Sequence, residues 1–84
     1  MNWEEWIEQI LIRLKELRYE NEVNPMTLAV VLGKHSKTGY YDIESGRTKL
    51  TVTNLAKLAT FYGLSVQYFF DLKNTEMVQK EKTA

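Results

Sequence analysis

The chain has 84 residues, enough for one domain near the lower size limit for unaided folding, and its 11 Lys and Arg residues balance its 11 Asp and Glu residues. With no cysteine and a single histidine, disulfides, thiolate metal sites and most nucleophilic chemistry are excluded. No apolar run approaches the roughly 20 residues that cross a bilayer, and the acidic, aromatic N-terminus is wrong for a secretory signal, so we expect a cytoplasmic protein.

The first part of the chain predicts one long helix over residues 2–20. Its apolar residues recur at the spacing of a single helix face, namely at Trp3, Ile7, Ile10, Leu14 and Leu17. Residues 1–24 are acidic, with six Glu residues against three Lys or Arg residues.

Two short helices follow, over residues 25–32 and 37–44. Asn24 is a preferred N-cap with proline after it, and Ser36 is a cap for the second helix. Gly33 is suited to the turn between them, so the pair predicts a helix-turn-helix arrangement. Gly39 lies inside the second helix, which indicates either close packing against a neighbour or a later helix start.

The remaining elements are helices over residues 52–62 and 66–72. Thr51, or alternatively Thr53, caps the first of these, and Ser65 caps the second. Residues 73–84 form a polar tail. With no strand pattern, the fold class is all-α.

A spread-out signature covers the chain from Ile12 to Phe70. It comprises Leu17-Arg18, Leu28-Ala29, Leu32-Gly33, Ile43-Glu44-Ser45-Gly46-Arg47, Leu55, Leu58-Ala59, Gly63-Leu64-Ser65 and Phe69-Phe70. In these residues the chain resembles the Cro/repressor-type helix-turn-helix domains, called the XRE family. The resemblance implies a five-helix, lambda-repressor-like fold, here with an extended N-terminal helix, and double-stranded DNA as the partner.

Site residues follow from the resemblance. The second short helix would enter the major groove, with base contacts from Lys37, Thr38, Tyr41 and Asp42, although a tyrosine could also bond a phosphate. Phosphate contacts would come from Arg47, Thr48 and Lys49 in the following loop, with Lys34, His35 and Ser36 of the turn assisting. An ion pair between Arg18 and Glu44 is implied as a structural feature, and Tyr40 is expected in the core.

Three features depart from the family pattern. Pro25 stands where the family has a phosphate-binding glutamine, so that contact is absent or is made by Asn24. The stretch 33–44 is about one residue longer than usual, which leaves the start of the recognition helix open by one position. The acidic, Trp-rich segment 2–9 is an addition.

The aromatic residues exceed what so small a core needs, which predicts a dimer. The family resemblance places its interface in the last helix, at Tyr68, Phe69 and Leu72. The alternative surface is the start of the first helix, at Trp3 and Trp6.

These observations predict a sequence-specific DNA-binding transcriptional regulator of bacterial, phage or plasmid origin. It would be a dimeric repressor or controller that acts by occupying its operator. The alternative is a protein-interaction module of the antitoxin or anti-repressor type, which the neutral charge and Pro25 favour. No nucleophile–base pair indicates an enzyme, and a lone His35 is no metal site. We expect no cofactor, metal or small-molecule ligand.

Overall fold

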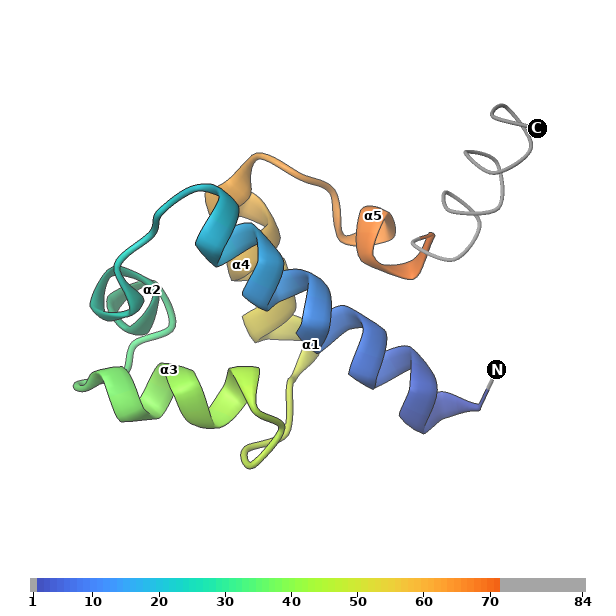
Figure 1. Cartoon of the computed structure of the whole chain (residues 1–84), viewed down its shortest axis with the longest axis horizontal. Coiled ribbons are helices and arrows are strands. Elements are labelled where there is room, and N and C mark those ends of the chain that lie inside the picture. The colour runs from blue at the N-terminus through green and yellow to red at the C-terminus, as the bar shows by residue number, and fades with distance from the viewer. Residues whose placement is uncertain (1, 72–84) are drawn as a thin grey trace.

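The computed structural model describes residues 2–71. Within them lie five helices and no strand (Figure 1): α1 (Trp3–Glu20), α2 (Pro25–Val31), α3 (Lys37–Glu44), α4 (Val52–Tyr62) and α5 (Val66–Phe70). The predicted all-α fold class is confirmed. No helix in this part of the chain is long and apolar enough to span a membrane.

Each helix begins directly after a polar residue whose side-chain oxygen accepts a backbone N–H of the first turn, which satisfies a donor that the helix leaves free. These caps are Asn2, Asn24, Ser36, Thr51 and Ser65. Of the two threonines considered for α4, Thr51 is the cap, because its hydroxyl accepts the N–H of Asn54 at 3.0 Å. Local side-chain chemistry therefore sets all five helix starts.

Three helix ends share one geometry, in which a residue with positive φ is followed by an N–H that donates to the carbonyl five residues earlier. After α2, Gly33 has a φ of 74° and the N–H of Lys34 donates to the carbonyl of Ala29 at 2.8 Å. Gly63 has a φ of 71° after α4. After α1 the same position holds Glu22, with a φ of 51°, a conformation that costs a non-glycine residue roughly 1 kcal/mol.

Three helices are shorter than the sequence predicts. Helix α1 begins at Trp3 and not at residue 2, because Asn2 is its N-cap. Helix α2 ends at Val31, one residue early, because Leu32 is the cap at which the backbone turns toward Gly33. Helix α5 ends at Phe70, with Asp71 as its cap. The predicted end of this helix at Leu72, and the predicted polar tail 73–84, lie outside the described residues.

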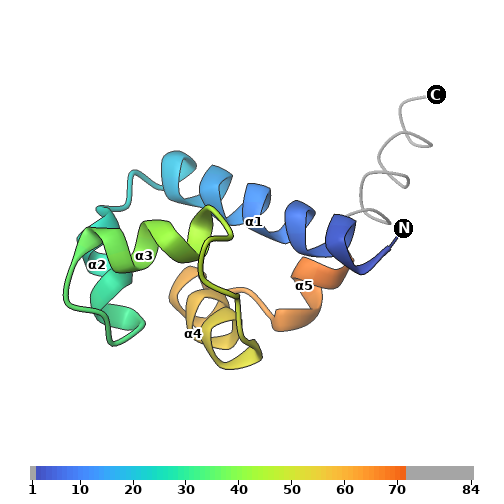
Figure 2. The ribbon, with the colours of Figure 1, turned by 90° about the horizontal axis from the view of Figure 1, so that it is seen from below.

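One buried cluster joins all five helices. It contains Ile10, Leu14, Leu17, Leu28, Ala29, Leu32, Tyr40, Ile43, Leu55, Leu58, Ala59 and Phe69. Helix α3 packs against α2 and α1, while α5 packs against α1 and α4. Figures 1 and 2 show the result: α3 lies near the C-terminal half of α1, α5 lies beside its N-terminal half, and α2 lies beyond the C-terminal end of α1. The expectation that Tyr40 belongs to the core is met, since 1% of its surface is exposed.

The prediction that Phe69 contributes to a dimer surface needs correction. Its side chain is 0% exposed and belongs to the central cluster, because the inward face of α5 seals the core against α1 and α4. Tyr68 is partly buried, and its hydroxyl accepts a hydrogen bond from Arg13 Nε at 2.7 Å. Of the three residues predicted for this interface, two therefore have contacts inside the subunit, and Leu72 lies outside the described residues.

Candidate nucleic-acid interface

The turn between α2 and α3 fixes the start of α3. Helix α3 begins at Lys37, and the Ser36 hydroxyl accepts the N–H of Gly39 at 3.4 Å. A Cβ atom on Gly39 would lie 2.9 Å from the Cβ of Lys34, closer than carbon atoms pack. Of the two explanations for this glycine, close packing holds, and the helix start stands at residue 37.

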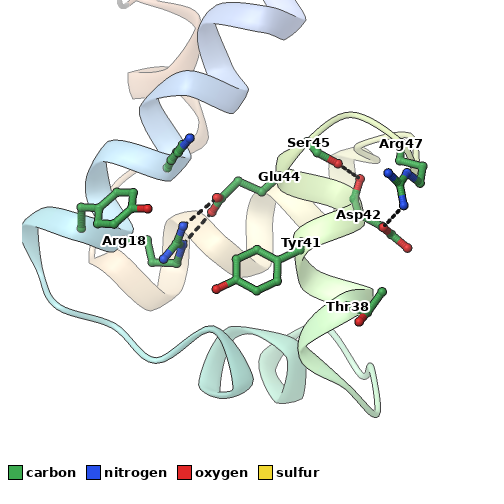
Figure 3. A pocket seen from close by; sticks show the side chains of 9 residues that line it. Arg18, Thr38, Tyr41, Asp42, Glu44, Ser45 and Arg47 are labelled. Atoms are coloured by element: carbon green, nitrogen blue, oxygen red, sulfur yellow. Dashed lines mark hydrogen bonds and ion pairs between the residues drawn. The ribbon is translucent and has the colours of Figure 1, made fainter.

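The sides of α3 are divided between core and solvent. Tyr40 and Ile43 point into the buried cluster, while Lys37 and Thr38 are exposed. Tyr41 is 41% exposed and points toward Arg18 of α1, whereas Thr38 lies with Asp42 and Arg47 (Figure 3). The four residues predicted to contact bases thus lie on the solvent side of one two-turn helix, with Tyr41 at the edge next to α1.

An ion pair fastens α3 to α1. Arg18 donates from Nε and Nη2 to the two carboxylate oxygens of Glu44, both at 2.9 Å, as Figure 3 shows. The hydroxyl of Tyr40 also donates to Glu44. The pair expected between Arg18 and Glu44 is therefore present, and it is largely buried.

The pKa values in this cluster follow from burial and hydrogen bonding. Burial by itself raises the pKa of Glu44, but hydrogen bonds from Arg18 and Tyr40 outweigh it and hold the pKa below its usual value. Burial and the hydrogen bond to Glu44 raise the pKa of Tyr40. Burial, helped by the charge of Glu44, raises the pKa of Tyr62 to about 12. Glu44 is accordingly ionised at neutral pH and both tyrosines are neutral.

Two tyrosine rings lie against the guanidinium group of Arg18. Its guanidinium carbon lies 4.5 Å from the ring centre of Tyr19 and 5.3 Å from that of Tyr41, within the range of cation–π attraction. This stacking holds Tyr41 against α1.

The predicted phosphate-contact residues lie at the two ends of α3. Before the helix, Lys34 is partly buried, while His35 and Ser36 are exposed; after it, Arg47, Thr48 and Lys49 are all exposed. Asn24 is exposed at the start of α2, where its side-chain oxygen accepts the N–H of Met26 at 2.9 Å. The side-chain amide of Asn24 still has N–H groups to donate.

The loop after α3 is held close to the helix. The N–H of Thr48 donates to the carbonyl of Asp42 at 2.9 Å, and a guanidinium nitrogen of Arg47 lies 3.5 Å from a carboxylate oxygen of Asp42. Gly46 makes the turn with a φ of 83°. The arginine thus lies directly beside the exposed side of α3.

Two residues that the sequence did not single out belong to the same surface. A hollow of about 470 Å³ lies between α1 and α3, and Lys15 and Tyr19 line it together with Thr38, Tyr41 and Arg47. Lys15 lies four residues after Leu11, and Tyr19 lies four residues after Lys15, so these side chains share one face of α1 with Arg18. Once Arg18 was paired with Glu44, this face of α1 could have been predicted to lie next to α3.

Within residues 2–71 no three His, Cys, Asp or Glu side chains converge on a point where a metal ion could bind. His35 is exposed in the α2–α3 turn.

Comparisons with known proteins agree with this arrangement. A sequence model described as helix-turn-helix, the XRE type, matches residues 14–69, more than half of the chain. No curated protein and no solved structure matches the chain. The matched range contains α2, α3, α4, the C-terminal part of α1 and all of α5 but its last residue, and it leaves out the acidic start of α1.

Proposed function

Because the chain belongs to the helix-turn-helix family of XRE type and is a DNA-binding transcription regulator of that type, we propose that it binds a specific duplex sequence as a homodimer and represses by occupying its operator. The observation that carries this proposal is the exposed side of α3, which has cationic residues at both ends. Lys37 lies at its first turn and Arg47 beside its last.

The proposed contacts divide into two classes. Lys37, Thr38 and Asp42 face outward from α3 and are proposed to meet base edges, where lysine donates to guanine and aspartate accepts from the cytosine amino group. Phosphate contacts are proposed from the residues around the two ends of α3 and from Asn24 at the start of α2, which fix the position of α3 without reading sequence. These are Asn24, Lys34, His35, Ser36, Arg47, Thr48 and Lys49.

Asp42 and Arg47 are proposed to exchange partners on binding. Their 3.5 Å ion pair is exposed to solvent on the arginine side, so little free energy opposes its opening. When Arg47 moves to a phosphate, Asp42 becomes free to accept from a base. The pair thus keeps a carboxylate on the DNA-facing surface from repelling the duplex before contact.

A homodimer is proposed because two recognition helices about 34 Å apart match successive major grooves. Among the described residues of α5, Phe70 has an aromatic side chain that is 46% exposed. It is a better candidate for the dimer surface than the buried Phe69. Light scattering of Phe70→Glu against Trp3→Glu would show which end of the molecule, α5 or the start of α1, holds the dimer together.

A gel shift with random-sequence and genomic duplexes tests the proposed function. We expect a shift at low salt that Lys37→Ala and Arg47→Ala weaken, with Lys37→Ala also relaxing the sequence preference. If a dimer contacts about six phosphates, the logarithm of affinity falls with the logarithm of salt concentration with a slope near −5. No shift at low salt would contradict the proposal.

A second candidate function is binding of another protein through the start of α1. Trp3 is 74% exposed there and lies among the exposed, acidic Glu4, Glu5 and Glu8. The absence of a DNA shift, together with stoichiometric capture of a partner that Trp3→Ala abolishes, would favour this function over operator binding.

A further inference from the structure

The hollow between α1 and α3 has an excess of positive charge. Its two acidic residues are paired, Glu44 with Arg18 at 2.9 Å and Asp42 with Arg47 at 3.5 Å. Lys15, which lines the same hollow from α1, is exposed and forms no ion pair with another residue of 2–71. One cation is thus left without a partner at the flank of the recognition helix.

Two tyrosines, Tyr19 and Tyr41, line the same hollow. Tyr19 is 64% exposed on α1 and Tyr41 is 41% exposed on α3, and their rings lie near the Arg18 guanidinium. The Tyr40 hydroxyl donates its hydrogen bond to Glu44. Within residues 2–71 neither the Tyr19 nor the Tyr41 hydroxyl donates a hydrogen bond to another side chain, so both can donate to a ligand.

The dimensions of duplex DNA place a phosphate at this flank. The major groove is about 12 Å wide, and a helix with its side chains is about 10–12 Å across. A helix that enters the groove therefore fills it and has a sugar–phosphate strand along each side. Because α1 borders one side of α3, its residues in the hollow face one of these strands.

We infer that the hollow binds a phosphodiester of the duplex backbone, with Lys15 as its cation and the hydroxyls of Tyr19 and Tyr41 as hydrogen-bond donors. This inference rests on the proposed operator binding and adds α1 to the elements that contact DNA. It also moves Tyr41 from the base-contact class to the phosphate-contact class. Arg18 supports the site by holding Tyr41 at the edge of α3.

Lys15→Gln tests the cation, with Lys57→Gln on α4 as the matched control, since Lys57 is also an exposed helical lysine but lies away from the hollow. Affinity for a random-sequence duplex is measured by fluorescence anisotropy over a series of salt concentrations. We expect Lys15→Gln to bind all sequences more weakly and to reduce the salt slope by about 1 per bound subunit. Lys15→Arg should restore both, and Lys57→Gln should match the wild type.

Tyr41→Phe separates the phosphate role from base contact. It keeps the ring over Arg18 and deletes the hydroxyl, so affinity should fall by a similar factor for every sequence, and a selection from random duplexes should return the wild-type preference. A preference changed at one base pair would assign Tyr41 to a base and overturn its place in the phosphate site.

Three other results would overturn the inference. The first is a Lys15→Gln variant with unchanged helicity, affinity and salt slope while the wild type binds DNA, which would leave the proposed function standing. The second is a wild type that binds no duplex, in which case both proposals fail. The third is saturable binding of inorganic phosphate alone in the hollow, with Lys15→Gln leaving duplex affinity unchanged; it would assign the site to a free anion.

Discussion

The surface around α3 and the surface at the start of α1 differ in charge, apolar exposure and internal bonding. Around α3 lie exposed cations, and its acidic residues are paired with arginines. At the start of α1, residues 2–12 contain three exposed Glu residues and no Lys or Arg, and Trp3 is largely exposed. Within a chain of zero net charge there are thus two surfaces of opposite charge, and only the location of the charges indicates a DNA partner.

The two surfaces also differ in the number of interactions that hold their side chains in place. Helix α3 is joined to α1 by a bidentate ion pair and stacked tyrosines. At the start of α1 the one side-chain hydrogen bond among residues 2–12 runs from the N–H of Glu5 to the side chain of Asn2. Rigidity is what base readout requires, because a groove-facing helix must hold its side chains in place. Substitutions should therefore have large effects near α3 and small effects at the start of α1.

The largest effect is expected from Arg18→Ala. It leaves the Glu44 carboxylate largely buried without its charged partner, which should lower the free energy of unfolding by about 3 kcal/mol. Urea unfolding followed by circular dichroism measures this loss, and a value below about 1 kcal/mol would show that the pair is not what joins α1 to α3. DNA affinity should fall as well, because α3 loses its fixed orientation.

Acid pH weakens the same pair. The folded-state pKa of Glu44 is depressed, so its contribution to stability is complete above the ordinary Glu value of about 4.3. That contribution is lost as the pH falls through the depressed pKa. Urea midpoints measured from pH 7 down to pH 3 should decline less steeply in Glu44→Gln than in the wild type, and parallel declines would contradict the assignment.

Glu22→Gly should stabilise the protein. The backbone at residue 22 has a φ of 51°, which glycine adopts without the penalty of a Cβ atom. Because glycine also gains freedom in the unfolded chain, the net gain in the free energy of unfolding is expected to be about 0.5 kcal/mol. Thermal unfolding provides the measurement, with Asn21→Gly, at a negative φ of −97°, as the control that should not stabilise.

The smallest effect on folding is expected from Trp3→Ala. A side chain that is 74% exposed contributes little to the core, so the free energy of unfolding should change by less than about 0.5 kcal/mol. Duplex affinity should stay at the wild-type value. A larger loss of stability that depends on protein concentration would assign Trp3 to the dimer surface instead.

Local signals accounted for most of the fold. The caps Asn24, Ser36 and Thr51 lie next to the helices they start, so the bounds of α3 and α4 were predicted to the residue. The predicted end of α2 was one residue too late. Helix propensity does not show whether Leu32 is the last helical residue or the cap that follows it.

Less of the candidate site than of the fold could be predicted from the sequence. The pairing of Arg18 with Glu44 came from the family resemblance, since nothing local joins residues 26 positions apart. Lys15 and Tyr19 were missed because their role depends on how α1 crosses α3. Phe69 was misplaced because an aromatic residue on a short last helix has the same local pattern whether it faces the core or a partner.

Chemical-shift mapping by NMR, with a duplex titrated into the labelled protein, tests the central claim most directly. Backbone amide signals should change at residues 34–49 and at Lys15 and Tyr19, while those of residues 3–8 stay in place. Changes confined to residues 3–8, or none at low salt, would contradict the claim that α3 and its flanks form the DNA-binding surface.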